Sequence, residues 1–350
     1  MADRSAVGVV PDNAAVISNV VTPDVVSVNA GTSGTASRTV AVLAGGLSHE
    51  REVSLRSGRR LAANLRTSGL SVVEWDADAT LLGRLRNERL DAVVIALHGG
   101  EGENGSVQAV LDLLDVPFVG TPSSACRRAW DKPTAKAEFV RAGLSTPDWV
   151  ALPHTTFREF GAQAVLDAMV DRLGLPLMIK PDQGGSALGA QVVSTAAELP
   201  AAMVSCLAYS DTVLAERFVR GTEVAVSVVH DGDEPRALPP VEVEPAGEVY
   251  DYTARYTPGA TTFHCPSRLD DTTIAALEDA ALAAHRLLGL RDVSRTDAVV
   301  DADGRVQILE VNVSPGLTDT SLLPMAAAAA GIELGDLYAA LVERAVERHL

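Results

Sequence analysis

The stretch SRTDAVVDADGRVQILEVNVSPG, residues 294 to 316, decides the fold. Apolar and polar side chains alternate in two runs, and the runs meet at Asp303-Gly304. This dipeptide favours the positive φ angles of a two-residue hairpin turn, and alternation with a period of two is typical of strands. The stretch therefore predicts an antiparallel hairpin with valine, leucine and isoleucine on one face.

The predicted turn determines which residues face each other. It pairs Asp297 with Glu310 and Arg295 with Asn312, and alternation places all four side chains on one face. Opposed carboxylates lie about 5 Å apart and repel each other unless a cation lies between them. Magnesium prefers such oxygen ligands. A solvated hairpin face explains any single one of these charges, whereas four polar residues in one register favour a metal site.

Composition limits the classes of function. A chain of 350 residues exceeds one typical core, so two or three lobes are expected. The net charge of -17, without a compensating run of Lys or Arg, argues against nucleic acid and anionic membranes as partners. The 3 cysteines are widely spaced and odd in number, which argues against disulfides and structural zinc. We expect a cytoplasmic protein.

The first 38 residues lack the basic start and apolar core of a signal peptide, so we expect a flexible N-terminal extension. No apolar run in the sequence reaches the length that spans a membrane. The sequence therefore predicts a soluble protein.

Strands and helices alternate from residue 39 to residue 121, which predicts an N-terminal α/β domain with a parallel, Rossmann-like sheet. Loops at the carboxyl ends of two strands carry Glu50, in AGGLSHERE, and His98, in LHGGEGENG. His98 is either a buried strand-end histidine or a site residue. Neither loop contains G-x-G-x-x-G, so an NAD-dependent dehydrogenase is disfavoured.

Residues 122 to 216 are expected to form a central lobe. Its strand LPLMIKPD leads into GGSALGA, a glycine-rich connector whose backbone N–H groups can face an anion. Lys132 and Lys180 would supply the cations for a phosphate. The P-loop pattern is absent from the sequence, and most glycine-rich connectors are simple turns.

Residues 217 to 350 are expected to form a C-terminal lobe. At its start, TVLAERFVRGTEVAVSVV predicts a pair of strands interrupted by Glu216 and Glu223. Either glutamate is a surface residue or, if a nucleotide lies across the strands, Glu216 accepts from an exocyclic amine and Glu223 from ribose hydroxyls. A long irregular stretch, residues 244 to 269, is typical of a lid. Helices are expected at TIAALEDAALAAHRLLGL and in the C-terminal tail.

Taken together, the motifs resemble those of the D-alanine:D-alanine ligase family, which has the ATP-grasp fold. They run from Val40 to the C-terminus: AGGLSHEREVSLRSG, ALHGGEGENGSVQ, WDKPTAK, LGLPLMIKP, GGSALG, YDYTARY, RTD and LEVNVSPGLTDTSLLP. The resemblance implies an α/β protein of three lobes, with the central and C-terminal lobes forming the ATP grasp. It also implies ATP-dependent ligation of two D-alanines through an acyl phosphate, for peptidoglycan precursors.

The resemblance assigns residues to ATP and its metal ions. Two magnesium ions, or manganese, would be held by Asp297, Glu310 and Asn312. Lys132 and Lys180 would bind the α- and β-phosphates, covered by the loop 184 to 189 with Gly185 and Ser186. The remaining nucleotide contacts would be Glu216, Phe218 and Val219 to adenine, Glu223 to ribose, and Arg255 to the γ-phosphate.

The resemblance also assigns the two amino-acid sites. Glu50 would bind the ammonium of the first D-alanine, and Ser321, beside Leu322, the carboxylate of the second. Arg295 and the backbone N–H of Gly316 would stabilise the oxyanion of the tetrahedral intermediate. Tyr256 and Ser186 would connect to Glu50 and close the lid against water.

The sequence departs from the common pattern of this family at three positions. Gly184 and Ala187 stand where many relatives carry Glu and a second Ser, and Arg255 replaces the usual Lys. Tyr256 is retained, which favours D-alanine over D-lactate as the second substrate. Alternatives are therefore a ligase for another D-amino acid or D-hydroxy acid acceptor, a biosynthetic cyclisation, or a nucleotide-binding regulator without catalysis. Members of the family are usually homodimers.

Overall fold

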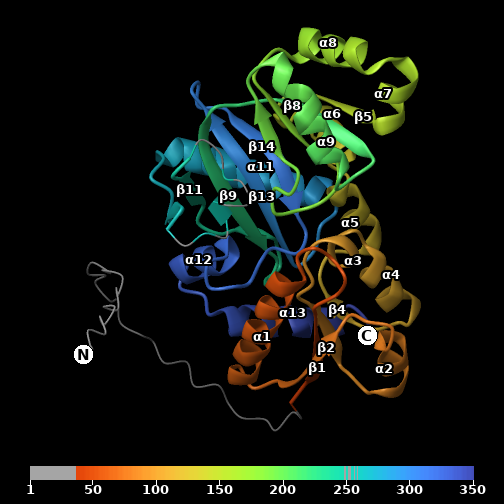
Figure 1. Ribbon diagram of the computed structural model, residues 1–350. Coiled ribbons are helices and arrows are strands. Elements are labelled where there is room, and N and C mark those ends of the chain that lie inside the picture. The colour runs from red at the N-terminus through yellow and green to blue at the C-terminus, as the bar shows by residue number, and fades with distance from the viewer. Residues whose placement is uncertain (1–36, 248–249, 251–253, 256, 258) are drawn as a thin grey trace, which may run out of the picture. The chain divides into compact units, whose positions relative to one another are not determined.

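The computed structural model describes residues 37–247, 250, 254–255, 257 and 259–350. Nearly all of the expected N-terminal extension, and Tyr256 of the expected lid, lie outside these residues. The described residues form one compact unit, Ser37–Leu350, that contains three β-sheets with helices between and around them (Figure 1). The α/β class expected from the sequence is confirmed.

The first sheet is parallel, as the alternation of strands and helices predicts, with strand order β2-β1-β3-β4. Apolar residues fill both faces of β1 and β3, because helices cover the two sides of a parallel sheet. Its elements are β1 (Thr39–Ala44), α1 (Arg51–Thr67), β2 (Ser71–Asp76), α2 (Leu81–Asn87), β3 (Ala92–Ile95), α3 (Gly100–Glu103), α4 (Ser106–Leu113), β4 (Phe118–Val119) and α5 (Ser123–Trp130).

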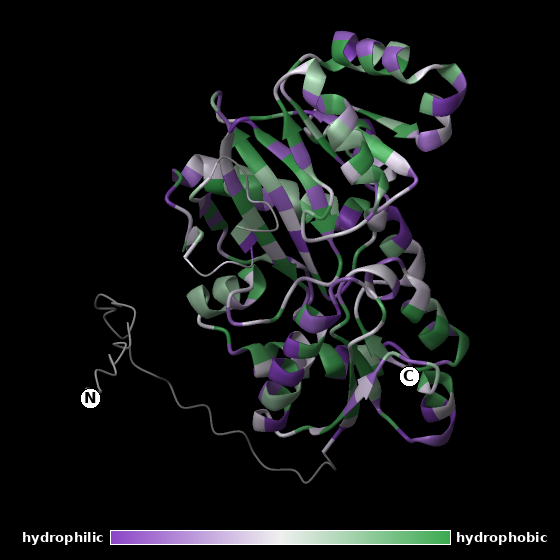
Figure 2. Cartoon of the chain, viewed as in Figure 1, coloured by the Kyte–Doolittle hydropathy of each residue, from purple (hydrophilic) through white to green (hydrophobic). Residues whose placement is uncertain are grey.

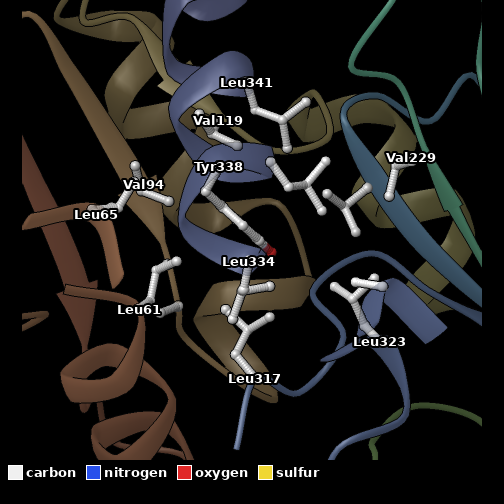
Figure 3. Packing of buried hydrophobic residues seen from close by; sticks show 14 of the residues in the cluster. Leu61, Leu65, Val94, Val119, Val229, Leu317, Leu323, Leu334, Tyr338 and Leu341 are labelled. Atoms are coloured by element: carbon white, nitrogen blue, oxygen red, sulfur yellow. The ribbon is translucent and has the colours of Figure 1, made fainter. Parts of the chain in front are cut away.

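The last helix of the chain, α13 (Leu334–Glu347), packs against α1 and the first sheet. Figure 3 shows Tyr338 of this helix beside Leu61 and Leu65 of α1, in a cluster that also reaches Val229. The end of the predicted C-terminal lobe thus shares a hydrophobic core with the N-terminal sheet. This shared core connects the N-terminal sheet to the segments that carry the predicted catalytic residues.

The second sheet is antiparallel, with strand order β5-β8-β6-β7. Along β6, Leu177 and Ile179 are buried in one core cluster, so Lys180 points to the other face of the sheet. The elements are α6 (Lys132–Arg141), β5 (Trp149–Pro153), α7 (His154–Phe160), α8 (Ala162–Leu173), β6 (Leu177–Pro181), β7 (Gln191–Val193), η1 (Ala196–Glu198), α9 (Leu199–Leu207) and β8 (Thr212–Arg217).

The third sheet has the order β12-β11-β9-β13-β14, with β10 paired to β9. Helix α11 begins where the Asp270 carboxylate accepts from two backbone N–H groups, and it covers one face of β9, β13 and β14. The elements are β9 (Gly221–Val229), β10 (Arg236–Ala237), β11 (Val241–Pro245), β12 (Thr261–His264), α11 (Asp271–Leu287), β13 (Val293–Asp301), β14 (Val306–Asn312) and α12 (Leu322–Ala329). Figure 2 shows hydrophilic residues interrupting these otherwise apolar strands.

Two predictions in this region were wrong. The strands on either side of residues 218–220 do not pair with each other: β8 lies in the second sheet and β9 in the third. The three residues between them therefore connect the two sheets. The stretch 244 to 269, expected to be irregular, contains β12, which pairs with β11.

The hairpin of β13 and β14 has the predicted partners but a different turn. Asp301 pairs with Arg305, so the loop holds three residues rather than two, and Gly304 has φ +75°. The longer loop shifts the register of the two strands by one residue. A β-bulge reverses this shift, because Asp297 faces Glu310 while Ala298 faces Ile308. Arg295 therefore faces Asn312, as predicted.

Within the described ranges, no single helix has both the length and the apolar composition of a membrane span. Helices α12 and α13 meet that criterion only as a pair, and they are bent by 100° at the break between them.

Candidate active site

A cavity of about 140 Å³ is lined by residues of the second and third sheets. Its lining contains all eight residues that the sequence assigns to the nucleotide, and two of the three assigned to metal. These are Lys132, Lys180, Gly185, Glu216, Phe218, Val219, Glu223 and Arg255, together with Asp297 and Glu310. The structure therefore brings together residues that are up to 178 positions apart in the sequence, from Lys132 to Glu310.

A second cavity, of about 100 Å³, adjoins the first. It is lined by the five described residues that the sequence assigns to catalysis, namely Glu50, Ser186, Arg295, Gly316 and Ser321, and also by Asn312 and Leu322. Tyr256, the sixth, lies outside the described residues. Arg255 and Glu310 line both cavities, so they mark the place where the two meet.

The polar face of the hairpin is a network of paired charges. Arg295 donates from Nε to Asp297 Oδ1 at 2.6 Å and from Nη2 to Oδ2 at 2.7 Å. Asn312 Nδ2 donates to the same Oδ2 at 3.2 Å. Lys132 Nζ lies 3.4 Å from Glu310 Oε2 on the neighbouring strand. The two opposed carboxylates are therefore each compensated by a cation, which removes the repulsion expected from the register.

Burial and charge act in opposite directions on these groups. Burial alone would raise the pKa of Glu310, but Lys132 and Lys180 outweigh it and lower that pKa. Burial likewise opposes the charge of Arg295, yet the contact with Asp297 holds the pKa of Arg295 above its ordinary value. Glu310 and Arg295 are therefore both charged at neutral pH.

The Glu216 carboxylate bridges two lysines. Lys136 Nζ lies 2.8 Å from its Oε1, and Lys180 Nζ lies 2.8 Å from its Oε2. Burial favours a neutral Glu216, but the two cations outweigh it and lower the pKa of this carboxyl. The carboxylate that is predicted to meet adenine is thus already engaged, and its partner Lys180 is the predicted phosphate ligand.

Lys136 was missed by the sequence analysis. Its side chain is fully buried, and burial lowers its pKa to about 8 although Glu216 opposes this shift. Its Nζ also donates to Thr146 Oγ1. Lys132 and Lys136 are four residues apart on α6, a spacing that places both on one helix face. That spacing, in WDKPTAK, is the signal that could have found it.

The glycine-rich loop between β6 and β7 contacts both cavities. Lys132 Nζ donates to the carbonyl of Gly184 at 2.7 Å, which ties α6 to the start of the loop. Ser186 and Ala187 have φ angles of 52° and 55°, in the left-handed region that most residues avoid. This backbone directs the Ser186 hydroxyl to Glu50 Oε1, to which it donates.

Glu50 lies directly before α1, at the carboxyl end of β1, as expected. Its carboxylate leaves no room for side chains nearby: a Cβ on Gly99 would lie 2.5 Å from Glu50 Oε2, and one on Gly185 would lie 2.9 Å from it. The two glycine-containing loops therefore close around this carboxylate. An acidic group at this position can accept a hydrogen bond from an ammonium.

Both interpretations of His98 describe part of what is observed. The residue is buried at the end of β3, and burial lowers its pKa to about 4, so the ring is neutral. Nδ1 lies 3.0 Å from the Ser314 carbonyl and Nε2 lies 2.8 Å from Ser57 Oγ. A carbonyl only accepts, so Nδ1 donates and Nε2 accepts from the Ser57 hydroxyl. His98 also lines the smaller cavity.

Glu103 is a second residue that sequence reasoning missed. It is 7% exposed, it accepts from the backbone N–H of Gly99 at 2.8 Å, and it lines the smaller cavity with Glu50. Burial, reinforced by the charge of Glu50, raises the pKa of Glu103. The motif LHGGEGENG contained it, but its three acidic or amide residues could not be ranked without knowing which is buried.

The loop between β14 and α12 carries Gly316 and Ser321. The Ser321 Oγ accepts from the backbone N–H of Thr318 at 3.0 Å and lies 2.8 Å from Thr318 Oγ1. A Cβ on Gly316 would lie 2.7 Å from Ser321 Oγ, so a side chain there would displace the Ser321 hydroxyl. The loop therefore places Gly316 and the Ser321 hydroxyl side by side at the wall of the smaller cavity.

Oxygen donors for a metal ion are present where the two cavities adjoin, because Asp297 lines the larger cavity, Asn312 the smaller one and Glu310 both. Asp297, Glu310 and Asn312 offer two carboxylates and one amide, the donor types that Mg²⁺ prefers. Neither here nor elsewhere in the described part of the chain do three or more His, Cys, Asp or Glu side chains gather to hold a metal. A Mg²⁺ site here thus fits the residues if phosphate oxygens supply the remaining ligands.

Comparison with known proteins places these residues in a family. Residues 139–343 match the family model described as D-ala D-ala ligase C-terminus. The D-alanine–D-alanine ligase of Anaeromyxobacter dehalogenans (strain 2CP-C) is 42% identical over 300 residues, covering 85% of this chain and 94% of that protein.

Two solved structures are similar over most of their length. The D-alanine–D-alanine ligase from Bacillus anthracis complexed with ATP has a TM-score of 0.75 at 27% identity, covering 89% of this chain and 99% of that one. The VanG D-Ala:D-Ser ligase from Enterococcus faecalis has a TM-score of 0.76 at 25% identity, covering 88% and 99%. With the sequence relative and the family model, these similarities show that the chain belongs to the D-alanine–D-alanine ligase family.

Proposed function

We propose that this protein joins two molecules of D-alanine into D-alanyl-D-alanine, converting ATP to ADP and phosphate through an acyl phosphate. The observation that carries the proposal is the pair of adjoining cavities that share Arg255 and Glu310. One has the lining of a nucleotide site and the other that of an amino-acid site. Their junction is where a γ-phosphate and a carboxylate would meet.

The larger cavity would bind ATP. Lys132 and Lys180 would contact the phosphates, Glu216 with the backbone of Phe218 and Val219 would contact adenine, and Glu223 would contact the ribose. Support comes from Lys132 and Lys180, which line this cavity and are only 9% and 12% exposed, and from Phe218 and Val219, which line it from the segment that connects the two sheets. Fixed cations suit phosphoryl transfer, because its catalysis is mostly positioning and charge neutralisation.

Magnesium ions would be held by Asp297, Glu310 and Asn312 together with phosphate oxygens. Bound there, they would neutralise charge on the transferring phosphoryl group. The protein prepares this site by keeping Glu310 ionised, since nearby lysines lower its pKa. Arg255, which also lines the junction, would add charge on the γ-phosphate side.

In the first step an oxygen of the first D-alanine's carboxylate would attack the γ-phosphorus, and ADP would leave. Glu50 would hold the ammonium of that D-alanine, with Ser186 fixing the carboxylate of Glu50. A carboxylate is a poor electrophile, and the acyl phosphate gives its carbon a leaving group. Closure of the glycine-rich loop over this site would exclude water that hydrolyses the acyl phosphate.

In the second step the amine of the second D-alanine would attack the acyl carbon, and phosphate would leave as the amide forms. Arg295 and the Gly316 N–H would stabilise the oxyanion that develops on the acyl oxygen. Ser321 would bind the carboxylate of the second D-alanine. Both Arg295 and Ser321 line the smaller cavity, which supports these roles.

The product would serve as the terminal dipeptide of peptidoglycan precursors in the cytoplasm. We also propose a homodimer, as expected from the resemblance to the family.

Incubation of the purified protein with ATP, magnesium and D-alanine tests the proposal, with phosphate release and D-alanyl-D-alanine measured together. We expect one dipeptide for each phosphate. Phosphate release without dipeptide would support the reaction of ATP with the first substrate but reject D-alanine as the acceptor. If D-alanine does not stimulate phosphate release, the ligase reaction with this substrate is rejected.

A ligase that uses D-serine as second substrate is the second candidate. The similarity to the VanG D-Ala:D-Ser ligase, at a TM-score of 0.76, favours including it. Competition between D-alanine, D-serine and D-lactate as acceptors, resolved by product mass, separates these substrates. We expect D-alanine to dominate.

A further inference from the structure

The loop that carries Gly316 and Ser321 is bound by helix α1 of the N-terminal lobe. Arg60 Nη1 donates to the carbonyl of Leu317 at 2.9 Å and to the carbonyl of Thr318 at 2.7 Å. Arg60 Nε lies 3.0 Å from Asp319 Oδ1. One guanidinium thus contacts three consecutive residues of the loop, more than 250 positions away in the sequence.

The two carbonyl contacts carry more weight than the ion pair. The Asp319 side chain is 91% exposed, so water screens its attraction to Arg60. The Arg60 side chain is only 32% exposed, and hydrogen bonds from a charged donor are stronger than neutral ones. These bonds also satisfy two carbonyls of a segment that lies between β14 and α12 and has no ladder of its own.

Further contacts support the same attachment. The backbone N–H of Leu317 donates to Ser57 Oγ at 3.2 Å, and Ser57 lies one turn before Arg60 on α1. At the start of the loop, Ser314 Oγ donates to the carbonyl of Leu97 at 2.8 Å. The loop is therefore attached to the N-terminal lobe at several points, and among the loop residues attached in this way, Thr318 and Asp319, which Arg60 contacts, lie nearest to Ser321.

Thr318 connects Arg60 to the hydroxyl of Ser321. Arg60 holds the carbonyl of Thr318, while the N–H and hydroxyl of Thr318 contact Ser321 Oγ. The orientation of the Ser321 hydroxyl therefore depends on the position of Thr318, and that position depends on Arg60. Helix α1 also begins directly after Glu50, so one rigid helix spaces Glu50 and this loop.

We propose that Arg60 is a positioning residue for the second amino acid. By fixing the carbonyls of Leu317 and Thr318 it holds Ser321 ready for the carboxylate of the second substrate, at a set spacing from Glu50, which would bind the first. This inference rests on the proposed ligase function. Arg60 itself contacts neither substrate.

Kinetics of Arg60→Ala, Arg60→Lys and Arg56→Ala test the proposal, with dipeptide formation fitted for ATP and for the two D-alanine sites. For Arg60→Ala we expect the KM of the second D-alanine to rise about tenfold or more, because charge-assisted hydrogen bonds are lost. The KM values of ATP and of the first D-alanine should change less than about twofold, because Leu317, Thr318 and Asp319, which Arg60 contacts, are not among the residues assigned to those two substrates. Arg60→Lys should restore part of the loss.

Arg56 is the matched control, since it is an exposed arginine on the same helix. Arg56→Ala should behave as wild type. An unchanged second-site KM in Arg60→Ala would overturn the proposal. So would an equal rise of all three KM values, because a general loss of structure has that effect.

Amide hydrogen exchange of the substrate-free protein gives a readout that does not depend on activity. In Arg60→Ala, exchange within residues 314 to 321 should accelerate while exchange in β13 and β14 stays unchanged. If the loop exchanges as in wild type, the Arg60 inference fails even for an active ligase. If wild type forms no dipeptide with any acceptor, the proposed function fails, and the role of Arg60 in substrate positioning fails with it.

Discussion

Arg295 and Asp297, two residues apart on β13, form a two-point ion pair with contacts of 2.6 and 2.7 Å. Side chains at this spacing lie on the same face of a strand, so the pair needs no other element to form. The predicted oxyanion donor is thus oriented by a predicted metal ligand. If the two residues have the proposed roles, the pair would couple the two chemical steps, because a change at Asp297 would also change Arg295.

Replacing Arg295 tests its role in the second step. We expect Arg295→Ala to lower the rate of dipeptide formation by about 100-fold or more, the typical effect of losing an oxyanion donor. Arg295→Lys should recover only part of the rate, because an ammonium cannot reproduce the two-point geometry. Circular dichroism and ATP binding check the fold. A wild-type rate in a folded Arg295→Ala protein would remove Arg295 from the mechanism.

Removal of the Ser186 hydroxyl tests the contact between the glycine-rich loop and Glu50. A hydrogen bond to a carboxylate is worth about 1.5–3 kcal/mol, so Ser186→Ala should raise the KM of the first D-alanine about tenfold. ATP hydrolysis without dipeptide should increase as well, because water reaches the acyl phosphate. Parallel assays of phosphate and dipeptide measure both effects.

Ser194→Ala is the matched control for that change. Ser194 is exposed and follows β7, beyond the loop. Its replacement should leave both values as in wild type. A Ser186→Ala protein with an unchanged KM and full coupling would show that the contact with Glu50 has no part in binding.

The hairpin illustrates what a sequence can and cannot determine. The alternation of side chains determines the face on which Asp297 and Glu310 lie, and their pairing was predicted correctly. The loop at Gly304 has one residue more than expected, and a bulge at Leu309 restores the register. The four polar residues lie beyond the bulge, where the register is the predicted one. The pairing was therefore right although the predicted turn was wrong.

The missed residues share a different cause. Lys136 and Arg60 are each engaged by partners from a distant segment of the chain, and Glu103, which accepts from nearby Gly99, lines a cavity with residues from distant segments. A helical spacing places Lys136 on the same face as Lys132, but it does not reveal that Glu216 lies opposite. Burial, which gives these side chains their properties, is decided by packing between segments that lie far apart in the sequence. The resemblance to a family identified site residues only at positions that match one of its motifs, and it assigned no role to these three residues.

The two lysines on Glu216 predict a dependence of stability on pH. The single Glu216 carboxylate can compensate the charge of only one of the two lysines. Burial lowers the pKa of Lys136 from 10.5 to about 8. Between these values the unfolded chain binds a proton that the folded protein does not, so the free energy of unfolding should rise with pH across this window. The contribution reaches about 3.5 kcal/mol at most, at about 1.4 kcal/mol per pH unit.

Denaturant unfolding of wild type and Lys136→Met at pH 7.5 and pH 10 measures this contribution. Both proteins respond to other titrating groups, but only wild type contains Lys136. We expect the stability of wild type relative to Lys136→Met to increase at the higher pH. A difference that stays constant between the two pH values would mean that the lysine keeps its ordinary pKa in the folded protein.

The buried Asp292 predicts where the C-terminus stabilises the fold. Its side chain is fully buried, and it accepts from Arg348 at 2.9 and 3.0 Å and from the N–H of Gly120 at 2.8 Å. Arg348 follows α13, so the contact attaches the end of the chain to the start of β13. Loss of Arg348 would leave a buried carboxylate with fewer partners.

We expect Arg348→Ala to lower the free energy of unfolding by roughly 2 kcal/mol, since the cost of an unpaired buried charge exceeds the value of the pair. Adding Asp292→Asn should recover part of that loss, because asparagine removes the charge and tolerates the φ of 64° found there. Glu347→Ala, at the exposed neighbouring position, is the control. Denaturant unfolding of the four proteins checks this order. If the double variant is less stable than Arg348→Ala alone, the buried charge is not the source of the loss.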